Sequence, residues 1–419
     1  MTSQSPKYFP IKTATSCRTK WGWSTIYLND GTTASCCRAS SGPIGSDFAN
    51  FHNTSKKIQS RQLMLDGQWP GDGCESCEVI ENAGGFSDRN FQNQIPDIYP
   101  KELDIDPTAV VVDPSILEVF FSNTCNLKCV YCNAKDSSAI QAENAKFGGA
   151  IIPSTEFEHT NNQYQKLAPA FWSWFIDKST TLQRLQVLGG EPFLQKDVTR
   201  LIDYFDNNPH PDLEFNIITN LSIGPAVMRR QLLNLSEIVK SRKLKRVDIQ
   251  VSVESWGIEQ EYTRHGFDCD TFENNLQLMF GMGTFRIGLL STVNALSILS
   301  MPDLCKRFLH WNKSQTIHWY MNSVTPVDGI FSPLNFDYKV FESALDSVTD
   351  ILPGKTWDEQ MTRNTFLGIQ ANLKNNCKDN IIKQQELYSY LNENDRRRNT
   401  DWRRTFPWLI NILERNNVV

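Results

Sequence analysis

The central part of the chain alternates between short apolar runs and longer stretches in which apolar residues recur at helical spacing. The apolar runs predict strands at 117–122, 185–188, 215–219, 247–253, 287–293 and 317–324. The stretches between them predict helices at 161–178, 195–207, 226–241, 271–281 and 302–312. Strands that alternate with helices are typical of a parallel sheet. Six strands and five intervening helices predict an α/β fold, a partial (β/α)6 barrel over 116–326, with its chemistry at the carboxyl ends of the strands.

The fourth of these strands has a polar face. Because side chains alternate along a strand, Asp248, Gln250, Ser252 and Glu254 share one face and apolar residues share the other. We expect the apolar face to pack on the outer helices. The polar face then points into the barrel, where buried polar groups need a ligand or a partner.

The segments on either side of the predicted barrel have a different character. Residues 1–95 form a small, Cys-rich and loop-rich domain, with a hairpin at 23–28 that reverses at Asn29-Asp30-Gly31. Prolines spread over 96–115 indicate a linker. Residues 327–419 predict a helical C-terminal extension, which contains a basic run from Arg396 to Arg404.

Composition narrows the classes of protein. A chain of 419 residues with 40% hydrophobic and 11% aromatic residues is unlike a disordered protein and too long for one compact core. Its net charge of −5 provides no basic field for nucleic acid. No apolar run reaches the ~20 residues that cross a membrane, and the amino terminus lacks the apolar core of a signal peptide. We therefore expect a cytoplasmic protein without a membrane partner.

Clustered cysteines are the main chemical signal. Eight of the 11 cysteines lie in the first third of the chain, whereas Cys269, Cys305 and Cys377 are isolated. In a reducing cytosol, such clusters indicate a metal site more often than disulfides.

Three of these cysteines, Cys125, Cys129 and Cys132, directly follow the first predicted strand of the barrel. Three thiolates from one loop can bind three irons of a cubane cluster and leave the fourth iron open to an external chelator. A zinc site would need a fourth protein ligand, and the next residues, Asn133-Ala134-Lys135, supply neither His nor Cys. The spacing favours a [4Fe–4S] cluster over a zinc site completed from elsewhere in the chain and over free cysteines.

A second set of cysteines lies in the N-terminal segment and comprises Cys17, Cys36 and the pair Cys74-x-x-Cys77. Four thiolates fit either a fully ligated [4Fe–4S] cluster or a structural zinc site, and the spacing does not separate the two. Cys37, beside Cys36, is an alternative ligand.

The loop Cys125-Asn-Leu-Lys-Cys129-Val-Tyr131-Cys132 resembles the C-x3-C-x-aromatic-C motif of the radical S-adenosylmethionine superfamily. The resemblance implies that the open iron chelates the methionyl amine and carboxylate of S-adenosylmethionine. It also implies that the reduced cluster cleaves this cofactor to a 5′-deoxyadenosyl radical, which abstracts hydrogen from a substrate. Tyr131 would lie beside the adenine.

Three further segments match the same family. Gly189-Gly190-Glu191-Pro192 ends the second predicted strand and resembles the segment that engages the methionine amine. Ser252 and Glu254 resemble the ribose-binding pair, and Arg264 matches a position expected near the cofactor carboxylate. A plain strand-to-helix turn and a surface arginine are the alternative interpretations.

The N-terminal cysteines resemble the SPASM or twitch module of this superfamily, which holds an auxiliary [4Fe–4S] cluster; that module usually follows the barrel, whereas here it precedes it. The resemblance implies electron transfer at the second cluster and a one-electron reductant such as flavodoxin or ferredoxin. The substrate would be a peptide or protein, or alternatively a small metabolite. An alternative from another class is a non-catalytic zinc-ribbon protein that contacts nucleic acid through Arg396 to Arg404, against which the acidic net charge argues.

Polar residues on the later strands are weaker candidates for the substrate end of the barrel. Each of them fits an ordinary core or rim polar group equally well: Asn220, Thr292, Asn294, His318, Tyr320 and Asn322.

Overall fold

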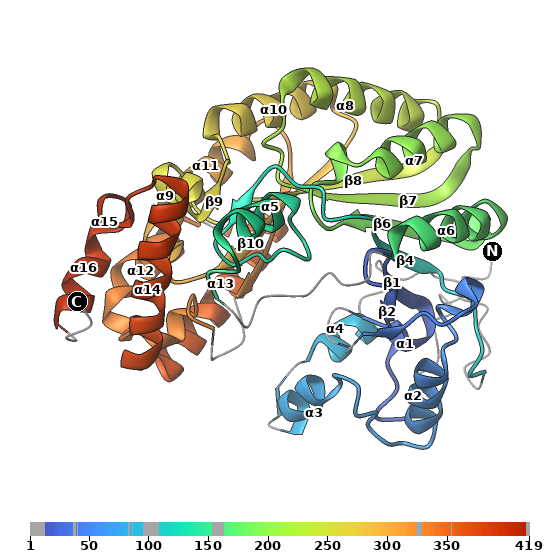
Figure 1. Cartoon of the computed structure of the whole chain (residues 1–419), viewed down its shortest axis with the longest axis horizontal. Helices are drawn as coiled ribbons and strands as arrows, with labels where there is room; N and C mark the ends of the chain where they lie inside the picture. Colours follow the sequence, from blue (N-terminus) through green and yellow to red (C-terminus); the bar gives the residue numbers. More distant parts are fainter. Residues whose placement is uncertain are drawn as a thin grey trace.

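The computed structural model describes residues 13–36, 39, 41–82, 84–85, 87–94, 109–152, 163–323, 329–352 and 354–415. Its centre is a nine-stranded sheet in the order β11-β10-β8-β7-β6-β4-β1-β2-β3 (Figure 1). The strands predicted for the barrel are all present and parallel: β4 (Ile116–Phe120), β6 (Arg184–Leu188), β7 (His210–Thr219), β8 (Leu244–Ser252), β10 (Arg286–Val293) and β11 (Ile317–Ser323). The predicted α/β fold with a partial barrel is confirmed.

Helices connect these strands and cover the outer face of the sheet (Figure 1). The helices predicted between the strands are present: α6 (Tyr164–Lys178), α7 (Lys196–Asn207), α8 (Pro225–Lys240), α10 (Cys269–Met282) and α11 (Met301–Trp311). Helix α7 illustrates why the pattern succeeds, because Val198, Leu201, Ile202 and Phe205 recur at helical spacing and are all buried. The spacing of apolar residues therefore sets which face of each helix meets the sheet.

The N-terminal segment extends the barrel sheet. Strand β1 (Trp23–Tyr27) pairs in parallel with β4, from Trp23 beside Ile116 to Tyr27 beside Phe120. Strand β2 (Thr32–Ala34) returns antiparallel, as the hairpin prediction expects, and β3 (Gly42–Pro43) pairs with β2. The sheet thus continues across the boundary predicted between residues 1–95 and 116–326, and the position of that boundary stays a prediction.

A row of polar side chains crosses the sheet at one level. Thr25, Glu118, Gln186, Asn216 and Asp248 are register neighbours on successive strands. The Thr25 hydroxyl donates to Glu118 at 2.6 Å and the Gln186 amide donates to it at 2.7 Å. Burial raises the pKa of the Glu118 carboxyl, although both donors lower it. Asp248, from the polar face predicted for β8, therefore lies at the end of a row of polar residues that runs from β1 to β8.

The remaining elements flank the sheet. Before the barrel lie α1 (Arg18–Gly22), α2 (Ser55–Leu65), α3 (Glu75–Asn82) and α4 (Asp88–Gln94). Within the barrel segment, α5 (Ser138–Phe147) and α9 (Ile258–Thr263) accompany a two-stranded sheet of β5 (Lys128–Cys129) and β9 (Arg264–His265). The helical extension is confirmed and consists of α12 (Glu342–Ile351), α13 (Trp357–Asn376), α14 (Ile381–Arg398), α15 (Trp402–Thr405) and α16 (Pro407–Arg415). Among the described helices, none is both long enough and apolar enough to span a membrane.

Candidate active site

The cysteine loop leaves the carboxyl end of β4. Leu127 and Val130 anchor it, since their side chains are 1% and 3% exposed. Cys129 lies in β5 and pairs with Arg264 of β9, and the Val130 amide donates to the Thr263 carbonyl at 2.8 Å. The loop that carries all three cysteines is therefore held by backbone pairing as well as by apolar packing.

The three thiols lie close enough to affect one another. Burial, with a smaller contribution from the neighbouring Cys129, raises the pKa of Cys125 to about 11. Burial also raises the pKa of Cys132 well above its ordinary value, with contributions from Cys129 and Cys125. Thiols with raised pKa values are protonated at neutral pH, so binding of a metal cluster must release their protons.

Three thiols in one loop match the ligands that a cubane cluster takes from a single segment. Within the described ranges, no three side chains of His, Cys, Asp or Glu converge closely enough to hold one metal ion. A cubane does not require such convergence, because each thiolate ligates a different iron. Cys125, Cys129 and Cys132 are thus a donor set that fits a [4Fe–4S] cluster and leaves one iron without a ligand from this loop.

The glycine turn after β6 packs directly on the cysteine loop. Gly189 and Gly190 have φ values of +81° and +57°. A Cβ atom on Gly190 would lie 2.4 Å from the Thr124 carbonyl oxygen, and the Glu191 amide donates to that same oxygen at 2.7 Å. Only glycine allows this backbone conformation together with so close an approach. The turn and the residue before Cys125 are therefore one packed unit.

The side chain of Glu191 is directed to the end of β7. It is fully buried and accepts hydrogen bonds from the Thr219 hydroxyl at 2.8 Å, the Asn220 amide at 2.7 Å and the Phe193 amide at 3.1 Å. Burial raises the pKa of this carboxyl to about 7, although the donors lower it. In this structure Glu191 joins two strand ends, and its contact with the cofactor stays a prediction.

Three of the predicted cofactor residues meet beside Cys129. The Arg264 guanidinium pairs with both oxygens of Glu254, with 2.7 Å from Nε to Oε2, and Tyr131 donates its hydroxyl to Glu254 Oε1 at 2.7 Å. A third contact joins Arg264 Nη1 to the Cys129 sulfur at 3.7 Å. Ser252 is half-buried at the end of β8. The structure brings Tyr131, Glu254 and Arg264 together at the cysteine loop, and the contacts of all four residues with ribose, adenine and carboxylate stay predictions.

The weaker candidates on later strands have mixed positions. The Asn220 amide donates to Asn126 in the cysteine loop at 2.9 Å, whereas Asn294 is buried and closes a local turn with Leu296. Thr292 and His318 are half-buried on their strands. The side chains of Tyr320 and Asn322 lie outside the described part of the chain. Asn126, which also donates to the Ser222 carbonyl at 2.7 Å, is a bridging residue that the sequence analysis missed.

The N-terminal cysteines surround one cavity of about 90 Å³, which Cys17, Cys36, Cys74 and Cys77 line together. Burial raises the pKa of Cys17 to about 11, and Cys36 contributes to the shift. The structure thus gathers the four predicted ligands of the auxiliary site. Cys37 lies outside the described residues.

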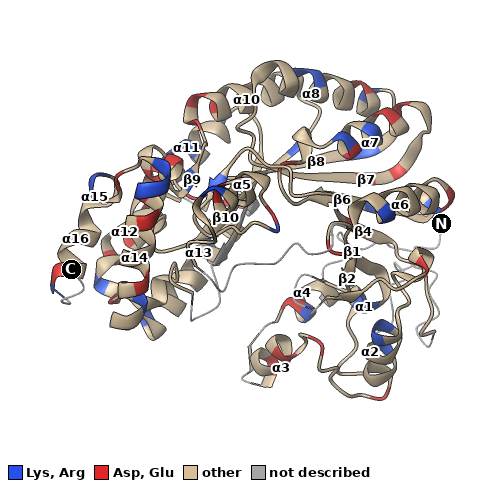
Figure 2. Ribbon diagram, viewed as in Figure 1, with Lys and Arg blue, Asp and Glu red and all other residues tan. Residues whose placement is uncertain are grey.

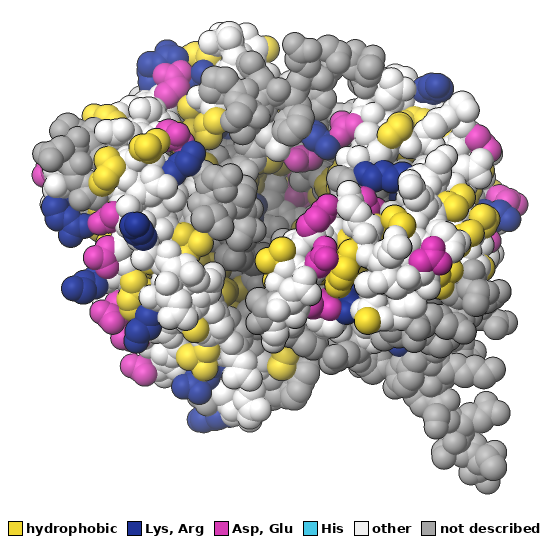
Figure 3. Space-filling view, turned by 90° about the horizontal axis from the view of Figure 1, so that it is seen from below, with side chains coloured by type: hydrophobic (Ala, Val, Ile, Leu, Met, Phe, Trp, Pro, Cys, Tyr) yellow, Lys and Arg dark blue, Asp and Glu magenta, His cyan; other side chains and the backbone are white. Residues whose placement is uncertain are grey.

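The basic run near the carboxyl terminus is largely paired with acidic groups. Arg398 is 8% exposed and pairs with Glu143 at 2.9 Å, while Arg396 and Arg397 pair with Glu393. Helix α14 carries both blue and red residues in Figure 2, and both signs of charge are interspersed on the face shown in Figure 3. Arg398 is therefore buried in an ion pair. This position differs from both earlier interpretations of the basic run, a solvated helix end and a contact with nucleic acid.

Comparison with known proteins gives distant matches. No family model matches the chain. A curated relative from Methanocaldococcus jannaschii, "Probable GTP 3',8-cyclase", is 21% identical over 190 residues, which cover 45% of this chain and 53% of the relative. The match therefore spans about half the length of that relative.

Solved structures show weak overall similarity. Streptococcus suis SuiB bound to S-adenosylmethionine aligns with a TM-score of 0.37 and 17% identity over 57% of this chain and 48% of SuiB. SuiB bound to its precursor peptide SuiA aligns with a TM-score of 0.35 and 15% identity, over 67% of this chain and 57% of SuiB. Native anSMEcpe with bound AdoMet and a peptide aligns with a TM-score of 0.33 and 14% identity, over 57% of this chain and 59% of anSMEcpe.

The likeness to a known superfamily rests on the cysteine loop in its structural setting and on the curated relative. The loop has the C-x3-C-x-Tyr-C spacing, follows the first strand of a partial (β/α)6 barrel and packs against a Gly-Gly-Glu-Pro turn from the next strand. In these features the chain resembles the radical S-adenosylmethionine superfamily.

Proposed function

We propose that the chain binds a [4Fe–4S] cluster on Cys125, Cys129 and Cys132, cleaves S-adenosylmethionine reductively and abstracts hydrogen from a peptide or protein side chain. The observation that carries the proposal is the position of the three thiols at the carboxyl end of β4, where the glycine turn and the Tyr131–Glu254–Arg264 group meet them. The carboxyl ends of parallel barrel strands are where such enzymes hold their reacting groups.

The protein would bind, orient and shield the cofactors. The bound cluster and S-adenosylmethionine supply the electron and the 5′-deoxyadenosyl radical. The half-buried backbone groups of Gly189 and Gly190 would face the methionine end, and the absence of a side chain lets a ligand approach them closely. Glu254 and its partner Arg264, both buried beside Cys129, would provide charges for the ribose and the carboxylate. The half-buried aromatic ring of Tyr131 would offer a flat apolar surface for the adenine.

A peptide or protein substrate is supported by the N-terminal cysteines, because the module they resemble often accompanies peptide modification. A small metabolite is the second candidate, which the name of the curated relative, a GTP cyclase, favours. Peptides and metabolites deuterated at carbon should be compared as substrates. Transfer of deuterium into 5′-deoxyadenosine from a peptide supports the first candidate, and transfer only from a metabolite supports the second.

We further propose that Cys17, Cys36, Cys74 and Cys77 hold an auxiliary [4Fe–4S] cluster that transfers electrons. The cavity these thiols line would accept a group larger than one ion. Four thiolates leave no iron open, which suits electron transfer rather than substrate binding. The electrons would come from a one-electron donor such as flavodoxin or ferredoxin.

Metal analysis of cysteine variants tests this site. Cys36→Ala should lose about four irons per chain, because Cys36 lines the cavity, whereas the neighbouring Cys37→Ala should keep them. Iron loss with Cys37→Ala alone would move the ligand by one residue. Zinc in this site, with the barrel cluster intact, would contradict the proposed electron transfer and make the N-terminal cysteines a structural zinc site.

A further inference from the structure

We infer that helix α14 of the C-terminal extension is part of the cluster site. In this account Tyr390 and Arg398 are positioning residues that fix the peptide groups on either side of Cys129, and Arg398 also supplies a buried positive charge that raises the reduction potential of the cluster. The inference rests on the proposed function, because it concerns the cluster on the cysteine loop.

The two carbonyls that flank Cys129 both accept hydrogen bonds from α14. The Arg398 Nη1 atom donates to the Lys128 carbonyl at 2.7 Å, and the Tyr390 hydroxyl donates to the Val130 carbonyl at 2.9 Å. The donors come from far along the chain, since 270 residues separate Arg398 from Lys128. Side-chain hydrogen bonds to both neighbouring peptides restrict the backbone that carries the middle cysteine.

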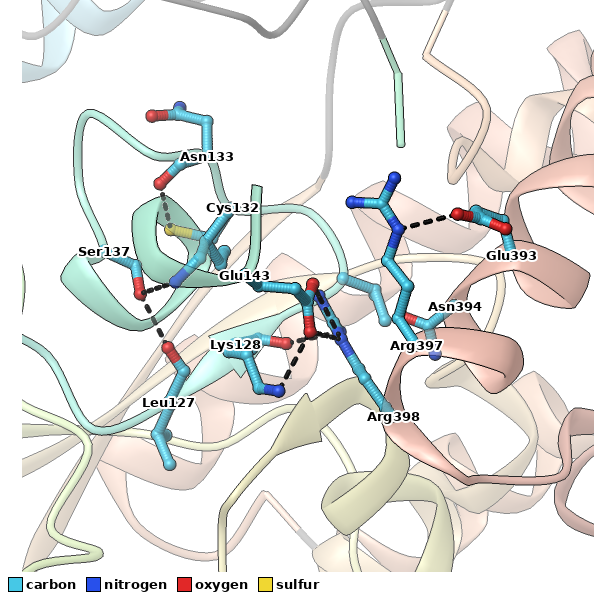
Figure 4. Close-up of polar contacts among 12 residues, drawn as sticks. Leu127, Lys128, Cys132, Asn133, Ser137, Glu143, Glu393, Asn394, Arg397 and Arg398 are labelled. Atoms are coloured by element: carbon cyan, nitrogen blue, oxygen red, sulfur yellow. Dashed lines mark hydrogen bonds and ion pairs between the residues drawn. The ribbon is translucent and has the colours of Figure 1, made fainter. Parts of the chain in front are cut away.

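Glu143 of α5 completes this contact. Arg398 pairs with both carboxylate oxygens of Glu143, at 2.9 Å from Nη2 to Oε2 and 3.1 Å from Nε to Oε1. Lys128 Nζ donates to the same carboxylate at 2.9 Å. Figure 4 shows Glu143 between Lys128 and Arg398. A planar guanidinium and a carboxylate joined in this way have a fixed relative geometry.

Helix α14 also holds the strand opposite Cys129. Asp395 accepts a hydrogen bond from the Tyr262 hydroxyl at 2.8 Å. Tyr262 precedes β9, whose Arg264 pairs with Cys129 and contacts its sulfur. One helix from the C-terminal extension therefore contacts both sides of the two-stranded β5–β9 sheet.

The charges near Cys129 favour reduction of a cluster. The group formed by Lys128, Arg398 and Glu143 carries one net positive charge next to Cys129. The charges of Arg264 and Glu254 cancel, and Asp136 adds a negative charge that acts on Cys132. The Arg398 side chain is 2% exposed, so water screens its charge little. Reduction adds an electron to the cluster, and a nearby buried cation stabilises the added negative charge. Net charge and burial are among the factors that set the potentials of iron–sulfur clusters.

Redox titration of reconstituted protein tests the inference, with the barrel cluster identified as the paramagnetic signal that changes when S-adenosylmethionine is added. Arg398→Gln should shift the reduction equilibrium about tenfold toward the oxidised cluster, which is about 59 mV for one electron. Arg398→Lys should restore most of the wild-type potential. Arg396→Gln on the same helix removes an exposed arginine that pairs with Glu393 and should change nothing.

Two further variants keep the test decisive if Arg398→Gln does not fold. Glu143→Gln should shift the potential in the opposite direction, because it removes the negative charge, and loosening of the loop alone does not predict that reversal. Tyr390→Phe should alter the line shape of the signal and lower cluster retention with little change in potential. Wild-type potentials in the Arg398 and Glu143 variants would overturn the inference. A wild-type protein without any cluster would instead overturn the proposed function.

Discussion

Replacement of Cys125, Cys129 and Cys132 by Ala should halve the iron of the reconstituted protein, from about eight to about four per chain. These thiols belong to one loop at the end of β4, whereas the N-terminal cysteines surround a separate cavity. Iron and sulfide assays after anaerobic reconstitution measure the loss directly. The variant should also release no 5′-deoxyadenosine.

Cys377→Ala is the matched control for this loss. Its thiol is half-buried in the C-terminal extension and donates to the Pro333 carbonyl at 3.3 Å. Iron content and cofactor cleavage should both stay at the wild-type level. Full iron in the triple variant, or an equal loss in Cys377→Ala, would contradict the assignment of the cysteine loop.

Gly190→Ala should displace the cysteine loop and reduce cluster content several-fold. The new methyl group would lie 2.4 Å from the Thr124 carbonyl oxygen, which is backbone and has no other rotamer to adopt. The positive φ adds strain of roughly 1–3 kcal/mol for a residue other than glycine. Since Thr124 precedes Cys125, the clash acts on the first ligand. Iron content and thermal unfolding of the reconstituted variant would show the effect.

Gly283→Ala separates the clash from the strain. Gly283 has a similar φ of +60°, but no atom lies within 4 Å of the position of its Cβ. It caps α10, away from the cysteine loop. This variant should lose only the stability that backbone strain removes and should keep its cluster. Equal cluster loss in both variants would show that the close approach to Thr124 does not matter.

The sequence predicted the elements that depend on local pattern. The spacing of apolar residues predicts the barrel strands and their helices. The spacing of three cysteines within one short segment predicts the cysteine loop. No local pattern in the sequence predicts the parallel pairing of β1 with β4, because the paired residues are far apart along the chain. Thr25 and its partner Glu118, for example, are 93 residues apart. Strand order depends on long-range packing, which a local pattern does not record.

The candidate site shows the same division. Tyr131, Glu254 and Arg264 were predicted from motif positions, and the structure places them in one hydrogen-bonded group. Arg398 could not be predicted as part of that site. In the sequence it is one of three consecutive arginines, and only the fold distinguishes it from the exposed Arg396 by placing Glu143 opposite it. A buried ion pair between distant segments cannot be predicted from the sequence of either segment alone.

Release of 5′-deoxyadenosine is the measurement that tests the central claim most directly. Anaerobically reconstituted protein, reduced and incubated with S-adenosylmethionine, should form 5′-deoxyadenosine and methionine, detectable by mass spectrometry even without substrate. This product is expected from the wild type and from Cys377→Ala, and none is expected from the Cys125, Cys129 and Cys132 triple variant. A protein that carries the barrel cluster and binds S-adenosylmethionine, yet releases no more product than the triple variant, would contradict the central claim.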